Sequence, residues 1–185
     1  MASNTFVSIS NRALTFLGAQ PITSLDDDTK EARACKRMYE QSRDQCLRGH
    51  PWNFAIKRVA LPADTTAAVW GYTNAFSWPS DCLRIIEVDT LEEWVVEGRK
   101  IVSDAAASLN IVYIAEVTDP TTFDALFTEA YAYRLAADIA YDITASQQVL
   151  NNMETLYQRK LAEARLVDAQ EALPADEDSW LDSRI

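Results

Sequence analysis

The chain has 185 residues, of which 48% are hydrophobic and 24% charged, and its formal net charge is −11 at pH 7. This length is typical of one domain, or of one domain with an inserted module. We expect no membrane-spanning helix, because no run of about 18 apolar residues occurs, and no secretory signal at the N-terminus. The acidic balance excludes the large basic surface that is typical of nucleic-acid-binding proteins.

The charge is distributed unevenly along the chain. Residues 1–60 carry nine Lys and Arg against six Asp and Glu, a net charge of +3, whereas residues 61–185 carry eight against twenty-two, a net charge of −14. This asymmetry indicates two unlike surfaces on one molecule. The alternative is that the charges only solvate the exposed faces of helices.

The three cysteines, Cys35, Cys46 and Cys82, form no CxxC pair. Without a secretion signal we expect them to be reduced thiols. A structural zinc site needs four ligands, and the chain offers only these three thiols and the single imidazole of His50. We therefore expect buried, inert cysteines and no metal.

Helical periodicity marks the N-terminal part of the chain. Residues 5–17 carry apolar side chains at helical spacing, and Gly18 follows as a stop signal. A second helix is predicted over about residues 29–48, with Asp28 as its N-cap and Glu31 completing a capping box. The predicted buried stripe of this helix is Cys35, Tyr39, Ser42 and Cys46.

Strand periodicity replaces helical periodicity in the middle of the chain. Short connections without intervening helices favour antiparallel pairing of these strands. The segment rich in Thr and Ala between Pro62 and Ser80 is predicted to be a loop. The predicted strands are residues 52–57, 82–88 and 110–117, and a hairpin of residues 94–96 and 100–102 that turns at Gly98.

The helical period returns at Asp119 and Pro120, a strong N-terminal signal for a helix that continues to about residue 143. This segment is apolar almost all round, so we expect it to be buried by its own domain or by a neighbouring subunit. Among its few charges, Arg134, Asp138 and Asp142 recur every four residues on one stripe.

A final helix is predicted after Ser146, ending near Glu171. The tail that follows, residues 172–185, has four acids and one Arg. It also carries three large hydrophobic side chains, Trp180, Leu181 and Ile185. Apolar anchors in a charged, extended segment favour docking onto a partner, the alternative being a floppy terminus with incidental hydrophobes.

Together these elements predict an α+β fold, mainly a helical bundle with a small inserted antiparallel β module. The bundle is discontinuous and is formed by residues 1–50 and 119–171. Residues 51–118 form the inserted module, and residues 172–185 form an extended acidic C-terminal tail.

The sequence carries no GxSxG, Gly-rich phosphate loop or HExxH motif. His50 precedes a proline, which disfavours a continuous helix that would align it with Cys46. Glu92 and Glu93 are adjacent in a strand region and point to opposite faces. We expect a scaffold or interaction protein, not an enzyme. Two alternatives are an enzyme whose site is assembled from scattered acids, and a monomeric interaction module.

Several local runs occur in a specific order along the chain. They are ALTFLG at residues 13–18, ITSLDD at 22–27, WNFA at 52–55, PSDCLRI at 79–85 and the Ala- and Leu-rich run at 123–143. In this order and spacing the chain resembles the tail tubular protein A family, the head-to-tail adaptors of short-tailed bacteriophages of the T7 type. The match covers roughly residues 5–170.

The resemblance implies a structural protein of the virion neck, assembled in the host cytoplasm. It implies a twelve-subunit ring beneath the portal protein that extends the DNA channel toward the tail nozzle protein, with tail fibres as further partners. DNA would pass through the lumen without specific binding, and no cofactor, metal or membrane would be involved. A neck protein of a long-tailed phage or prophage is the alternative.

Two sets of contact residues follow as hypotheses. We expect the tail to bind the portal through Trp180, Leu181 and Ile185. We expect a heterologous contact between subunits, in which cations of the second helix face acids of the last helices. The residues assigned to this contact are Arg33, Arg37, Arg43, Asp138 and Asp142.

Overall fold

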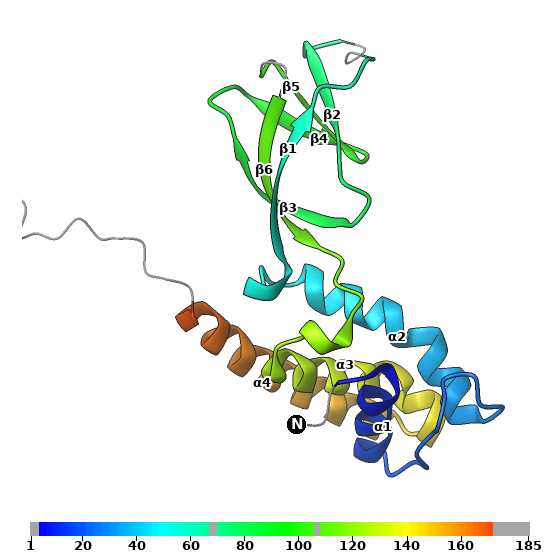
Figure 1. Cartoon of the computed structure of the whole chain (residues 1–185). Coiled ribbons are helices and arrows are strands. Elements are labelled where there is room, and N and C mark those ends of the chain that lie inside the picture. Colours follow the sequence, from blue (N-terminus) through cyan, green and yellow to red (C-terminus); the bar gives the residue numbers. More distant parts are fainter. Residues whose placement is uncertain (1–3, 67–69, 106–107, 172–185) are drawn as a thin grey trace, which may run out of the picture.

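The computed structural model describes residues 4–66, 70–105 and 108–171. The chain forms a helical body and a β module that projects from it (Figure 1). The helices are α1 (Phe6–Phe16), α2 (Lys30–Arg48), α3 (Ala125–Thr144) and α4 (Gln147–Glu171). The strands are β1 (Ile56–Pro62), β2 (Asn74–Ser77), β3 (Cys82–Asp89), β4 (Trp94–Glu97), β5 (Lys100–Ser103) and β6 (Ser108–Ala115). The predicted α+β class is confirmed.

Helix α1 has a cap at its N-terminus that the sequence analysis did not predict, and it ends at the predicted glycine. The Thr5 hydroxyl accepts a hydrogen bond from the Ser8 amide, and the Ser8 hydroxyl accepts one from the Thr5 amide. This reciprocal cap satisfies two amide groups that the first helical turn leaves unpaired. Gly18 follows the helix with a φ of +67°, a left-handed conformation that favours glycine.

The N-cap of α2 is Thr29 and not Asp28, so the predicted capping box is wrong. The Thr29 hydroxyl accepts a hydrogen bond of 3.1 Å from the Ala32 amide. Asp28 pairs with Arg33 of the helix instead, and Asp27 belongs to the preceding loop, where hydrogen bonds from the Ser24 and Thr23 amides lower its pKa. The predicted buried stripe of α2 is confirmed, since all four of its residues are buried.

Helix α3 forms the centre of the helical body. Helices α1, α2 and α4 all pack against it, with α2 and α4 on different sides (Figure 1). Half of its 20 residues are buried. Of the two predicted explanations for this apolar helix, burial by its own domain is therefore the one observed. The largest fully buried side chains of α3 are Phe127, Tyr131 and Leu135.

The first strand begins later than predicted, because Trp52 packs in the helical core. Residues Asn53–Ala55 form a 3₁₀ turn, so β1 begins at Ile56 and not at residue 52. The Trp52 side chain is fully buried in the helical core, where its ring meets that of Phe127 edge to face at 5.1 Å. Burial of this indole, and not strand alternation, sets the local backbone.

The start of the third helix is also corrected. Asp119 caps only a short 3₁₀ turn, Pro120–Thr122, and α3 begins later with Asp124 as its N-cap. Between the two, Phe123 is extended and buried against Phe127, with ring centroids 5.2 Å apart. The chain therefore interrupts the predicted helix to place an aromatic ring in the core.

The β module contains two three-stranded antiparallel sheets, ordered β1-β6-β3 and β2-β5-β4. The predicted antiparallel pairing and the hairpin at Gly98 are confirmed. The prediction of a loop over residues 62–80 is wrong in part, because β2 lies within it and pairs with β5. The module has a hydrophobic core of its own, with Phe76, Ile101, Leu109, Ile111 and Tyr113 among its buried residues.

All three cysteine thiols are buried and none forms a disulfide. Burial raises the pKa of Cys35 and Cys82 to about 11 and that of Cys46 to about 12. A raised pKa favours the neutral thiol in the folded state, so this contribution to stability is present below the ordinary thiol pKa and is lost as the pH rises above it.

We therefore expect the folded protein to react very slowly with a thiol-specific chromogenic reagent at pH 8, because the thiolate is the nucleophile. In 8 M urea all three thiols should react at once. We also expect the urea midpoint to fall between pH 8 and 10.5. Rapid titration of even one thiol in the folded protein would contradict this account.

Candidate interaction surfaces

The charges predicted to link subunits are already paired within one chain. Arg37 forms an ion pair with Asp142, joining α2 to α3, and Arg33 pairs with Asp28. Asp138 accepts hydrogen bonds from Ser42 and from Arg134. Of the residues assigned to the contact between subunits, Arg37 and Asp142 pair with each other, but they do so within one molecule.

Contrary to the sequence-based prediction, the structure does not place Arg43 on an exposed contact surface. Its side chain is only 4% exposed, and it pairs with the carboxylates of Glu116 and Asp44. Glu116 directly follows β6, where the chain returns to the helical body. Arg43 is therefore part of the joint between the two bodies and is not available to a neighbouring molecule.

Further polar contacts hold the joint together. Arg48 of α2 donates to the Leu83 carbonyl of β3, and the Glu116 amide donates to the Asp81 carbonyl. The Asp81 carboxylate accepts a hydrogen bond of 2.7 Å from Lys57 and another from the Tyr113 hydroxyl. Burial alone would raise the pKa of Asp81, but these hydrogen bonds and the charge of Lys57 outweigh it and lower the pKa. Of these contacts, that of Arg48 joins a helix to the β module, whereas those of Asp81 connect strands and the returning chain at the base of the module.

His50 makes contacts that stabilise the fold. Its Nε2 lies 2.9 Å from a carboxylate oxygen of Asp168, and its ring packs edge to face on Trp52. The second oxygen of Asp168 accepts a hydrogen bond from the Asn53 amide. This arrangement ties the end of α4 to the linker that leads into β1.

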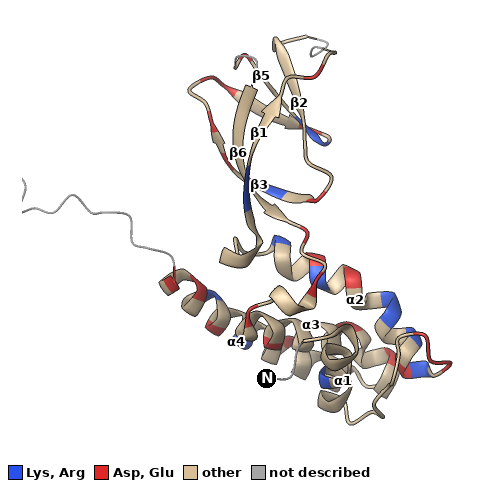
Figure 2. Cartoon of the chain, viewed as in Figure 1, with Lys and Arg blue, Asp and Glu red and all other residues tan. Residues whose placement is uncertain are grey.

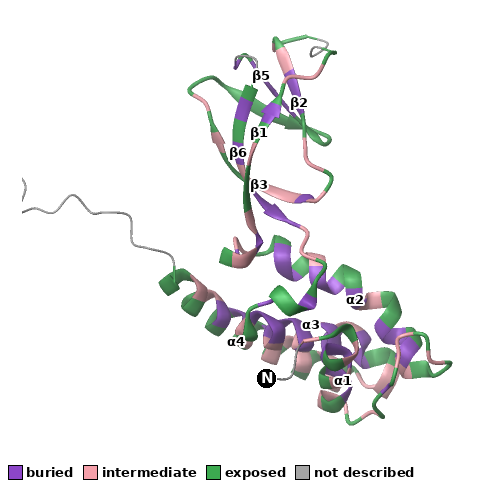
Figure 3. Ribbon diagram, in the orientation of Figure 1, coloured by how far each residue is buried: buried purple, intermediate pink, exposed green. Residues whose placement is uncertain are grey.

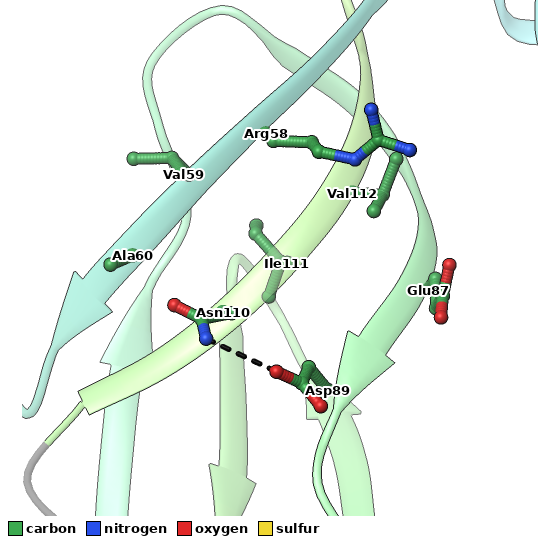
Figure 4. Close-up of a pocket in the computed structure, with 8 residues that line it drawn as sticks. All are labelled: Arg58, Val59, Ala60, Glu87, Asp89, Asn110, Ile111 and Val112. Atoms are coloured by element: carbon green, nitrogen blue, oxygen red, sulfur yellow. Dashed lines mark hydrogen bonds between the residues drawn. The ribbon is translucent and has the colours of Figure 1, made fainter.

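A hollow of about 510 Å³ lies on the outer face of the β1-β6-β3 sheet (Figure 4). Arg58 and Glu87 line it from the two outer strands, on either side of Val112. Asn110 donates a hydrogen bond of 3.1 Å to Asp89 beside them. No local pattern in the sequence pointed to this face of the sheet, which is polar and carries both positive and negative side chains.

Large apolar side chains are exposed on both bodies. On α4, Leu166 is 62% exposed, and Ala162 and Ala169 lie exposed about one turn away on either side. We call these three residues the α4 stripe. On the β module, Leu91 and strand β4 are exposed (Figure 3). The sequence signal for the second surface was the apolar run of residues 94–96 within a hairpin.

The predicted portal-binding residues Trp180, Leu181 and Ile185 lie outside the described residues. Within the described ranges, no cluster of three or more His, Cys, Asp or Glu side chains is arranged to hold a metal ion. No helix in these ranges has the length and hydrophobicity needed to cross a membrane.

The chain matches no protein-family model, and no curated protein has a significantly similar sequence. The resemblance to the tail tubular protein A family therefore depends on the local runs quoted above.

Proposed function

We propose that this chain is a structural subunit of a head-to-tail adaptor ring in a short-tailed bacteriophage, located between the portal protein and the tail nozzle protein. The proposal combines the family resemblance with one feature of the molecule. That feature is the presence of uncovered apolar side chains on two separate bodies of an elongated chain (Figure 3). Exposed apolar patches bounded by polar residues are typical of protein interaction sites.

The α4 stripe suits packing between copies of the chain. Its small alanine side chains allow close approach of a second helix, and Leu166 supplies an apolar anchor. Because α2 and α4 pack on different sides of α3, the stripe of one copy can meet the α2 side of the next. Such a heterologous contact generates a ring when its rotation closes.

The remaining surfaces have roles in this proposal too. The tail of residues 172–185 would contact the portal, and the β module would face the nozzle protein or the tail fibres. A net charge of −11 disfavours adhesion of the DNA phosphates to a channel lined by this protein. The genome would therefore slide through the ring without binding to it.

A charge placed in the α4 stripe tests the proposal. We expect Leu166→Glu to reduce ring assembly on purified portal protein at least about tenfold, because a carboxylate would be buried without a partner in the contact. Sedimentation velocity of mixtures with the portal protein measures assembly, and circular dichroism checks the fold of the variant.

Thr65→Glu is the matched control, since it adds the same charge at an exposed loop of the β module. This control should assemble as the unmodified chain does. Normal ring assembly by the Leu166→Glu variant would exclude the α4 stripe as the contact between copies.

A further inference from the structure

Strand β4 is an outer strand of its sheet. In the order β2-β5-β4 it pairs with β5, and no other described segment pairs with it. In an antiparallel strand, alternate residues direct their amide and carbonyl groups to the side away from the partner. The outer edge of β4 therefore offers hydrogen-bonding groups to a further strand.

The side chains of this edge are mostly apolar and exposed. Trp94, Val95 and Val96 are each about 40% exposed, and Leu91, just before the strand, is fully exposed. Outer strands usually avoid pairing with other chains by means of short length, charged side chains, prolines, bulges or a covering segment. Of these devices β4 has its length of four residues and the charge of Glu97, but it contains no lysine or proline, and its pairing with β5 has no bulge.

Carboxylates flank β4 along the chain, and acidic residues are coloured red in Figure 2. Glu92 and Glu93 directly precede the strand and Glu97 ends it, and all three are exposed. None of the three forms an ion pair with another described residue. The two nearby cations are occupied, since Lys100 pairs with Asp64 at 2.7 Å and Arg99 donates to backbone carbonyls that include that of Pro79. The strand therefore has negative charges at both ends that no ion pair balances.

We propose that β4 binds an extended, positively charged segment of another protein, which adds to the β2-β5-β4 sheet as a fourth strand. Main-chain hydrogen bonds along β4 would provide affinity. Apolar side chains of the segment would pack on Trp94 and Val96, and its Lys or Arg side chains would pair with the surrounding glutamates. This inference goes beyond the adaptor role and does not depend on it.

Charge identifies the occupant. The tail of residues 172–185 has four acids against one Arg, so the glutamates around β4 would repel it. Pairing of β4 with the β4 of a second copy would bring two sets of glutamates together, and like charges across neighbouring strands are destabilising. An extended basic segment from a different protein is the occupant that satisfies both the apolar and the charged parts of the edge.

The probe for this surface is a fluorescent eight-residue peptide in which Lys and Val alternate. We expect saturable binding to the full chain by fluorescence anisotropy, together with slower hydrogen exchange of the β4 amides. We expect the double variant Glu92→Lys and Glu93→Lys to bind the peptide about tenfold more weakly, because two attractions become repulsions. Both glutamates are exposed and form no ion pair in the described chain, so the fold should persist.

The control is the double variant Glu40→Lys and Glu171→Lys, which changes the net charge equally at exposed sites on the helices. It should bind within about twofold of the unmodified chain. Lack of saturable binding, unchanged binding by the β4 variant, or unchanged exchange of the β4 amides would overturn the proposal. Equal binding of a peptide in which Gly replaces Val, or preferential binding of a peptide of residues 172–185, would also overturn it.

Discussion

Replacing Trp52 by alanine should lower the free energy of unfolding by about 4 kcal/mol, one of the largest losses for a single substitution in this chain. The indole is fully buried and contacts the rings of His50, Phe54 and Phe127. Its Nε1–H donates a hydrogen bond of 3.0 Å to the Cys46 carbonyl. The substitution leaves both a cavity and a buried carbonyl without this donor.

Urea unfolding followed by circular dichroism measures this loss. The matched control is Trp70→Ala, because Trp70 is 86% exposed. The control should change the free energy of unfolding by less than about 0.5 kcal/mol. A loss below about 1 kcal/mol for Trp52→Ala would contradict the role of this indole as the centre of the aromatic core.

The second large effect is expected at the joint between the two bodies. Glu116→Ala should lower the free energy of unfolding by about 2 kcal/mol, because it leaves the buried Arg43 guanidinium with a single carboxylate, that of Asp44. A fully buried pair that loses one partner costs about 3–5 kcal/mol. The smaller value is expected here because Asp44 remains and the Glu116 side chain is partly exposed.

Asp142→Ala provides the comparison, since it removes an ion pair with Arg37 at the surface of the same helical body. Surface pairs contribute at most about 1 kcal/mol, so this variant should unfold close to the unmodified chain. Urea unfolding at low and high salt separates the two cases, because salt screens the surface pair more strongly. Equal effects of the two variants would show that burial of Arg43 contributes nothing.

Local sequence signals predicted much of the fold. Apolar spacing identified the helices, and Gly18 and Gly98 marked a helix end and a hairpin turn that the structure confirms. The errors occur where tertiary contacts override local patterns. Trp52 and Phe54 alternate with smaller or polar residues as they would in a strand, yet both rings pack in the helical core.

The candidate contact residues were less predictable. The charge pattern placed Arg37 and Asp142 among residues expected to attract one another, but it could not distinguish a partner in the same chain from one in a neighbour. Arg43 pairs with Glu116, a residue 73 positions away that follows a strand, and no helical pattern relates the two. The exposed edge of β4 depends on strand order, which only the folded chain reveals.

Native mass spectrometry of this chain, mixed with the portal protein encoded in the same genome, tests the adaptor role most directly. We expect one assembly in which a closed ring of copies, twelve if the family resemblance holds, is bound to the portal. A chain that remains monomeric and unbound at every mixing ratio would contradict the proposed function.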